Sequence, residues 1–228
     1  MLNKITIGAL LSSVALFAVQ PAMAADVAAP APAPSAANTI SLEVNPEFYG
    51  TTKAGSFATG DLDDLNYKLA LSHSFSNNVV LGGDIQYTQR APIAGVSSSV
   101  DQAEITLGYK LKLDAVTLTP GLLLGYGFGD EPKINPANNF TPDAYWAVTL
   151  NADFKLNSQW TWNVFSLRYR NAFDYTWITP KISTGITYNI DKADAVYLNV
   201  GNAWKDKGDG NGLLEDKYNI AVGYKYSF

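Results

Sequence analysis

Two arginines separated by one residue, Arg168 and Arg170, are the strongest candidates for chemistry in this sequence. If their segment is a β-strand, both side chains lie on the same face and stack along it. A guanidinium group can bind a carboxylate through two parallel hydrogen bonds. The spacing therefore favours a track for carboxylated solutes, and pairing of the arginines with Asp153 or Glu104 is the structural alternative.

The sequence offers little for catalysis or metal binding. It contains no cysteine and one histidine, His73, which excludes disulfides, thiolate zinc sites and clusters of histidine ligands. His73 shares the apolar face of its segment and is expected to be an interfacial ring. The segment 205–215 carries oxygen ligands at Asp206, Asp209, Asn211 and Glu215, but their spacing does not match a calcium-binding EF-hand loop. We expect neither an enzyme nor a bound metal or other cofactor.

Composition narrows the class of protein further. Of the 228 residues only 16% are charged, below the roughly 25% of ordinary soluble domains, while 12% are aromatic. Lys and Arg number 16 against 21 Asp and Glu, which gives a formal net charge of −5. This balance excludes the basic surface that nucleic-acid binding requires, so no nucleic acid is expected as a partner.

The N-terminal residues predict export rather than folded structure. Lys4 is followed by an apolar run over 5–19 and by Ala22-Met23-Ala24, so 1–24 is interpreted as a secretory signal peptide. The run is shorter than the about 20 residues of a membrane-spanning helix. Residues 25–38 are rich in Pro and Ala and predict an extended or disordered leader.

From Thr39 to Phe228, apolar and polar residues alternate in ten segments, the pattern of transmembrane barrel strands. The connections alternate between short turns and longer loops, the latter at 50–64, 91–100, 129–142, 171–176 and 205–215. The pattern predicts an all-β fold, a transmembrane antiparallel up-and-down β-barrel over 39–228 with about ten strands. Eight strands, if the loop at 171–176 is absent, and twelve are the alternatives. Pro46, Pro120 and Pro180 are expected at bulges or strand ends, because proline cannot donate to the ladder.

The apolar face is expected to contact lipid, since the polar face has too few charges for a soluble exterior. Representative outward residues are Leu107, Leu122, Val148, Leu167, Ile182 and Val222. The last strand ends in Tyr224, Tyr226 and Phe228, which resemble the assembly signal of bacterial outer-membrane barrels. Expected partners are outer-membrane lipid and lipopolysaccharide, periplasmic chaperones and the barrel-assembly machinery, and the expected state is a monomer.

The opposite, inward face carries more basic than acidic residues. The basic ones are Lys68, Arg90, Lys110, Lys112, Lys155, Arg168, Arg170, Lys181 and Lys225, and the acidic ones are Glu43, Glu47, Asp84, Glu104 and Asp153. Basic side chains around a pore favour anions. Inward glycines, among them Gly125, Gly185 and Gly223, are interpreted as leaving space. The alternative is that opposite charges pair and plug a narrow barrel.

Several segments resemble the small oligogalacturonate-specific porin family (KdgM-type), in order over most of 39–228. They are Leu69–Phe75, Thr119–Gly121, Ser166–Arg170, Tyr188–Asn202 and Tyr218–Phe228. The resemblance implies a twelve-stranded, monomeric channel with a basic interior that takes acidic oligosaccharides across the outer membrane. It also implies that Arg168 and Arg170 line the lumen.

Together these features predict a bacterial outer-membrane barrel that acts as a narrow, passive channel. Its expected solutes are small anions, with acidic oligosaccharides as one class. A non-conducting structural or adhesin-type surface barrel is the alternative function.

Overall fold

The computed structural model describes residues 38–50, 60–90, 99–128, 143–174, 178–206 and 212–228. The chain divides into two compact units, Met1–Ala33 and Pro34–Phe228, and every described residue belongs to the second. The signal peptide and the leader up to residue 37 lie outside the described residues and stay predictions. No helix long and apolar enough to cross a membrane occurs in the part of the chain that the structure describes.

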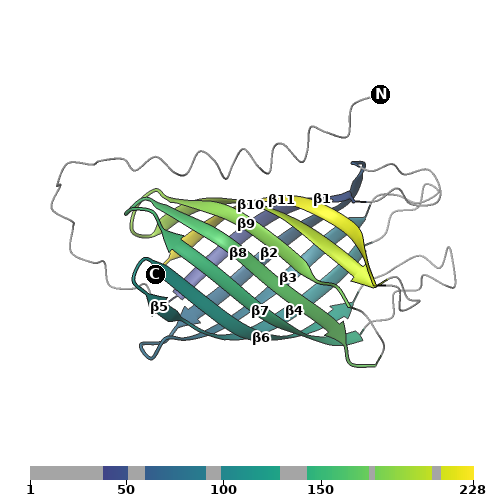
Figure 1. Cartoon of the computed structure of the whole chain (residues 1–228), viewed down its shortest axis with the longest axis horizontal. Helices are drawn as coiled ribbons and strands as arrows, with labels where there is room; N and C mark the ends of the chain where they lie inside the picture. Colours follow the sequence, from purple (N-terminus) through teal and green to yellow (C-terminus); the bar gives the residue numbers. More distant parts are fainter. Residues whose placement is uncertain (1–37, 51–59, 91–98, 129–142, 175–177, 207–211) are drawn as a thin grey trace, which may run out of the picture. The chain divides into compact units, whose positions relative to one another are not determined.

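The described residues form one antiparallel sheet that closes on itself (Figure 1). Its order is β4-β3-β2-β1-β11-β10-β9-β8-β7-β6-β5, and an additional pairing of β4 with β6 closes the barrel. The strands are β1 (Asn38–Tyr49), β2 (Leu62–Ser74), β3 (Val79–Arg90), β4 (Ser99–Tyr109), β5 (Leu111–Leu113), β6 (Val116–Phe128), β7 (Asp143–Lys155), β8 (Trp160–Ala172), β9 (Lys181–Asn189), β10 (Asp194–Asp206) and β11 (Leu213–Ser227).

The short β5 continues β4, so the wall of the barrel has ten strands. Gly108 of β4 pairs with Gly121, and Leu111 of β5 pairs with Leu118 in the same register of β6. The pairing lapses between them, where Pro120 has no backbone N–H to donate. The predicted count of ten is therefore confirmed, and the alternatives of eight and twelve strands are wrong.

The other two prolines lie beside a bulge and at a strand end, as predicted, whereas Pro120 lies inside β6, which corrects the prediction for this residue. Pro46 lies beside a register shift between Glu47 and Phe48, and the β1–β11 pairing skips it. Pro180 immediately precedes Lys181, the first residue of β9, and accepts a hydrogen bond at 2.8 Å from the N–H of Trp204. Proline is tolerated in these places because no internal ladder bond depends on its missing N–H.

The strands are steeply tilted, as Figure 1 shows, because the register is staggered around the barrel. Following paired residues once around the barrel from Trp160, at the start of β8, leads to Phe173, just past the other end of the same strand. The Phe173 N–H donates to the Ala144 carbonyl, and the offset between Trp160 and Phe173 is the stagger of the register. The path runs through Tyr188, Val196, Tyr224, Leu42, Leu69, Ile85, Ala103, Tyr126 and Ala144.

Both ends of the barrel chain and all the short turns lie at one end of the barrel. The Asn38 N–H donates to the Phe228 carbonyl at 3.1 Å, and Asn78 and Asp114 take left-handed φ values of 69° and 50° in two of these turns. Asp191 caps another turn by accepting backbone N–H bonds from Ala193 and Asp194, which hold the pKa of its carboxyl below the usual value. The longer connections leave from the opposite end, and the strand break predicted near 171–176 is present between β8 and β9.

The predicted outward face is confirmed. The six representative apolar residues are between 40% and 62% exposed, namely Leu107, Leu122, Val148, Leu167, Ile182 and Val222. Tyr224, Tyr226 and Phe228 are exposed on the same face, with the last two rings stacked at 5.9 Å. Their role as an assembly signal stays a prediction. An exterior this apolar suits a hydrocarbon environment rather than water.

Replacing Val222 with Arg should destabilise the barrel in lipid by about 2–4 kcal/mol if this residue lies near the bilayer midplane. The cause is the transfer of a charged side chain into hydrocarbon. Urea unfolding in lipid vesicles measures the loss, with Val222→Ala as the uncharged control. Equal stability of the two variants would show that Val222 does not face lipid.

Candidate functional site in the lumen

The inward face brings three of the predicted basic residues into ion pairs with carboxylates. Lys68 Nζ lies 3.5 Å from Glu43, Arg168 Nη1 lies 3.7 Å from Glu104, and Lys181 Nζ lies 3.6 Å from Glu47. The first pair joins neighbouring strands, but the other two cross the interior. Arg168 on β8 reaches β4, and Lys181 on β9 reaches β1. We call the four residues of these two crossing pairs, Arg168, Glu104, Lys181 and Glu47, the charged belt.

Two tyrosine hydroxyls donate hydrogen bonds to carboxylates of the lumen. The Tyr145 hydroxyl donates to Glu104 at 2.7 Å, and the Tyr197 hydroxyl donates to Glu43 at 2.9 Å. Their cationic partners lie beyond the usual hydrogen-bond range for N–H···O. The Arg168 Nε atom is buried and has no hydrogen-bond partner among the described residues. The carboxylates are thus firmly hydrogen-bonded by the tyrosines, whereas the cations make no short hydrogen bond to them.

In all three ion pairs, the basic side chain is more exposed to solvent than the carboxylate it pairs with. The side chain of Lys68 is 29% exposed against 11% for Glu43, and that of Arg168 is 26% exposed against 4% for Glu104. For Lys181 and Glu47 the values are 22% and 19%. In each pair the cation is the group more accessible to water, so the wet surface of this level is more basic than a count of charges suggests.

The two arginines of the predicted track have different environments. Arg170 is only 8% exposed, its Nε donates to the Thr179 hydroxyl at 2.8 Å, and its guanidinium lies 5.2 Å from the centre of the Tyr145 ring. It is packed into the wall rather than presented to the lumen. The sequence left two carboxylates, Asp153 and Glu104, as structural partners for the arginines. Arg168 pairs with Glu104, whereas Asp153 accepts a hydrogen bond from Asn163 at 2.9 Å.

The remaining basic candidates are spread along the barrel. Lys225 lies 4.8 Å from the centre of the Tyr197 ring, and Lys110 donates to the Ser74 hydroxyl at 2.8 Å. Arg90 is half-buried at the end of β3, on the side of the long connections, whereas exposed Lys112 and Lys155 lie beside short turns. The structure therefore does not gather all the predicted residues into one site.

Some inward glycines receive side chains instead of leaving space. A Cβ at Gly125 would collide with the Tyr145 ring, one at Gly223 with the Tyr197 ring, and one at Gly185 with the Asn199 amide. The interpretation that these glycines widen the lumen is therefore wrong. Their physical role is to let the rings of Tyr145 and Tyr197 lie against the wall, in reach of their carboxylates.

A second charged group, centred on Lys217, was not predicted. Its ammonium lies 3.4 Å from Glu47 and 2.9 Å from Asp63, and it also binds Asp64. A register shift in β2, where Glu47 pairs with Asp64 but Phe48 with Leu62, brings both aspartates inside. Strict alternation cannot place two adjacent residues on one face. Lys217 itself could have been found, because it shares the parity of the inward Asn219.

His73 lies near the short-turn end, as predicted for an interfacial ring. Its Nδ1 is 2.9 Å from the Asn38 side-chain oxygen, and its ring packs edge-on against Phe75 at 4.3 Å. Over the described ranges, no group of three or more His, Cys, Asp or Glu side chains is placed to hold a metal ion. The oxygen ligands noted in 205–215 have side chains outside the described residues.

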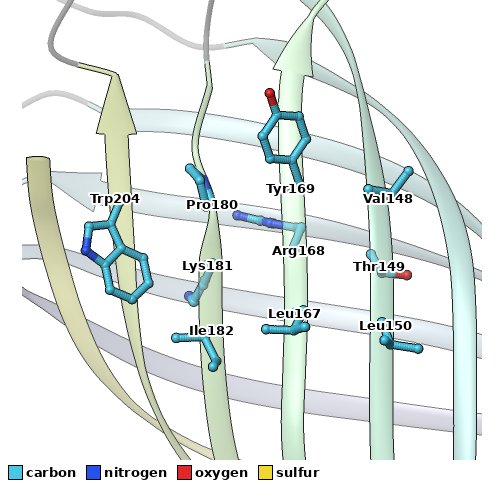
Figure 2. A pocket seen from close by; sticks show the side chains of 10 residues that line it. All are labelled: Val148, Thr149, Leu150, Leu167, Arg168, Tyr169, Pro180, Lys181, Ile182 and Trp204. Atoms are coloured by element: carbon cyan, nitrogen blue, oxygen red, sulfur yellow. The ribbon is translucent and has the colours of Figure 1, made fainter. Parts of the chain in front are cut away.

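Figure 2 shows Arg168 and Lys181 side by side on β8 and β9, in a stretch of wall that also carries Leu167, Tyr169 and Ile182. This stretch borders an apolar hollow of about 490 Å³, which extends to Pro180 and Trp204. The basic pair and the exposed apolar residues thus occupy alternate positions of the same two strands, as period-two geometry requires.

A closed, antiparallel barrel with an apolar exterior, a charged interior and both chain ends on the short-turn side is the architecture of bacterial outer-membrane barrels. The fold is shared with an outer-membrane channel from Pseudomonas putida F1, at a TM-score of 0.55 and 10% identity over 90% of this chain and 100% of that one. It is also shared with the β domain of the Bordetella autotransporter BrkA, at a TM-score of 0.51 and 10% identity over 86% and 100%.

The solved structures that resemble this chain also include a KdgM porin, with a TM-score of 0.45 and 18% identity over 82% of this chain and 99% of that one. No protein-family model matches the sequence. No curated protein matches it either.

Replacing Gly125 with Ala should destabilise the barrel by about 1–3 kcal/mol, because the new methyl group overlaps the Tyr145 ring. Gly82→Ala is the matched control, since a Cβ at this inward glycine meets its nearest atom at an ordinary 3.5 Å. Urea unfolding of the refolded barrel compares the two. A Gly82 variant as unstable as the Gly125 variant would contradict the packing role of Tyr145.

Replacing Lys217 with Met should cost about 3–5 kcal/mol of stability, because it leaves the buried Asp63 and Asp64 carboxylates without their shared cation. Lys205→Met is the control, since Lys205 is more exposed and forms an ion pair with Asp216, so its loss should cost about 0–1 kcal/mol. Denaturant midpoints at constant m-value measure both. Similar midpoints for the two variants would show that the Lys217 group does not stabilise the barrel.

Proposed function

We propose that this protein is a bacterial outer-membrane channel through which small anionic solutes diffuse passively. The observation that carries the proposal is the exposure of the lumen ion pairs. Lys68, Arg168 and Lys181 are each more accessible to water than the carboxylates they pair with. A solute in the lumen therefore meets ammonium and guanidinium groups before it meets carboxylates.

Electrostatics and width together would set the selectivity of such a channel. A positive charge at the charged belt acts over a few ångströms in a medium less polar than bulk water, so it attracts anions more strongly than a surface charge does. Lys225 and Lys110 would extend the basic surface toward the short-turn end. Acidic oligosaccharides fit this charge pattern as one class of solute, and the activity is transport rather than catalysis.

The proposal includes the surroundings of the barrel. The exposed apolar wall favours contact with outer-membrane lipid and lipopolysaccharide. Export through the predicted signal peptide would bring the chain to periplasmic chaperones and the barrel-assembly machinery, for which Tyr224, Tyr226 and Phe228 form the proposed signal. We propose a monomer, since the ten-stranded wall closes without a second chain.

A non-conducting structural barrel is the second candidate, and one observation favours it. The Arg168–Glu104 and Lys181–Glu47 pairs cross the interior, and the inward tyrosine rings fill space beside them. Small barrels can fill their interior completely with side chains. Conductance separates the two candidates directly.

Replacing Arg168 with Gln should lower the anion-to-cation permeability ratio by about two- to fivefold, because it removes a positive charge from the charged belt at nearly constant size. The reversal potential of single channels in a salt gradient measures this ratio. Lys192→Gln removes the same charge from an exposed turn outside the lumen and should leave the ratio unchanged.

Equal selectivity of the Arg168 and Lys192 variants would reject the role of the charged belt. The absence of any conductance in the unmodified, correctly folded barrel would favour the structural candidate.

A further inference from the structure

Arg168 and Lys181 form a pair of like charges on adjacent strands. They are direct partners in the β8–β9 register, so their Cα atoms are about 4.5–5.5 Å apart. Figure 2 shows the two side chains next to each other. Like charges in this relation destabilise a sheet unless an anion lies between or beside them. The pair therefore needs a negatively charged partner.

Arg168 and Lys181 bind their carboxylate partners, Glu104 and Glu47, only at long distance. Glu104 lies 3.7 Å from Arg168 Nη1, and Glu47 lies 3.6 Å from Lys181 Nζ, and neither distance is that of a charge-assisted hydrogen bond. Arg168 Nε is buried and unpartnered among the described residues, so the guanidinium does not form a two-point bond to Glu104. The donors of the pair are thus only partly used.

Each wall carboxylate has another partner that would remain if its cation left. Glu104 accepts the hydrogen bond from the Tyr145 hydroxyl at 2.7 Å, and Glu47 lies 3.4 Å from Lys217. Leaving a buried polar group without any partner is costly, but here neither carboxylate would be left alone. Exchange of the anion beside Arg168 and Lys181 therefore leaves Glu47 with a cation and Glu104 with the neutral Tyr145 hydroxyl as its hydrogen-bond donor.

From this arrangement we propose that Arg168 and Lys181 form an exchangeable carboxylate-binding site, which Glu104 and Glu47 occupy in the empty barrel and from which the carboxylate of a solute displaces them. One oxygen of the solute carboxylate binds the guanidinium and the other the ammonium group. The inference rests on the proposed channel function only for the route by which the solute arrives. The wall carboxylates act as internal competitors, so the site binds weakly enough to release its ligand.

Acetate labelled with ¹³C at the carboxyl carbon is a suitable probe, titrated by NMR into the refolded full-length barrel in detergent micelles at low salt. Replacing Glu104 with Gln removes the competitor charge but keeps an oxygen that accepts the Tyr145 hydrogen bond. This variant should bind acetate about fivefold more tightly, the factor expected if the internal carboxylate occupies the site about four-fifths of the time. Arg168→Gln should abolish saturable binding.

Glu43→Gln is the matched control, because Glu43, like Glu104, is paired with a basic side chain and hydrogen-bonded by a tyrosine but lies outside the charged belt. Its acetate affinity should change by less than about twofold, since the competitor at Arg168 remains. Heat-modifiable electrophoretic mobility checks folding of every variant. If the Arg168 variant does not fold, Lys181→Gln replaces it, with the same expected loss of binding.

Unchanged acetate affinity in the Glu104 variant, equal tightening in the Glu104 and Glu43 variants, or saturable binding retained without Arg168 or Lys181 would each overturn the site. The channel function fails by a different result, the absence of conductance in bilayers, which the binding titration does not involve. Acetate binding with the expected variant pattern in a non-conducting barrel would keep the site and reject the channel.

Discussion

The structure depends on one constraint: the backbone groups of the wall must bond to one another, because the exposed outer surface is apolar. Closure through the β1–β11 and β4–β6 pairings removes the free edges of the sheet. Pro120 of β6 is accommodated opposite the break between β4 and β5, where no partner needs its missing N–H. Since alternate residues face outward, nearly all the polar chemistry of these strands is confined to the narrow interior, where charges must neutralise one another.

Inside the barrel, the carboxylates are bound more closely by their partners than the basic side chains are. Tyrosine hydroxyls bind Glu43 and Glu104 at short distance, whereas Lys68 and Arg168 stand farther off and nearer to water. The charges of the lumen can therefore neutralise one another while the water-accessible surface of the lumen still presents basic groups. The same carboxylates that stabilise the fold would then tune how strongly an anion is held, which links the packing of the wall to the proposed transport.

Period-two alternation was sufficient to predict the ten strands and their outward faces, because both depend on local pattern alone. The charged belt could not be predicted in this way. Arg168 and Arg170 have the same parity, yet Arg170 packs against Thr179 and Tyr145 while Arg168 pairs with Glu104, and these partners come from other segments. The Lys217 group depends on a bulge at Asp63 that alternation does not encode.

The tyrosine rings that lie over Gly125 and Gly223 have a consequence for how this sequence can diverge. A larger residue at either glycine excludes the ring, and a smaller residue in place of the ring leaves a void beside a carboxylate that has lost its donor. Substitutions at the two positions of each pair should therefore be inherited together. Among descendants of a common ancestor, Gly125 with Tyr145 and Gly223 with Tyr197 would covary as units, even where the surrounding strand residues change freely.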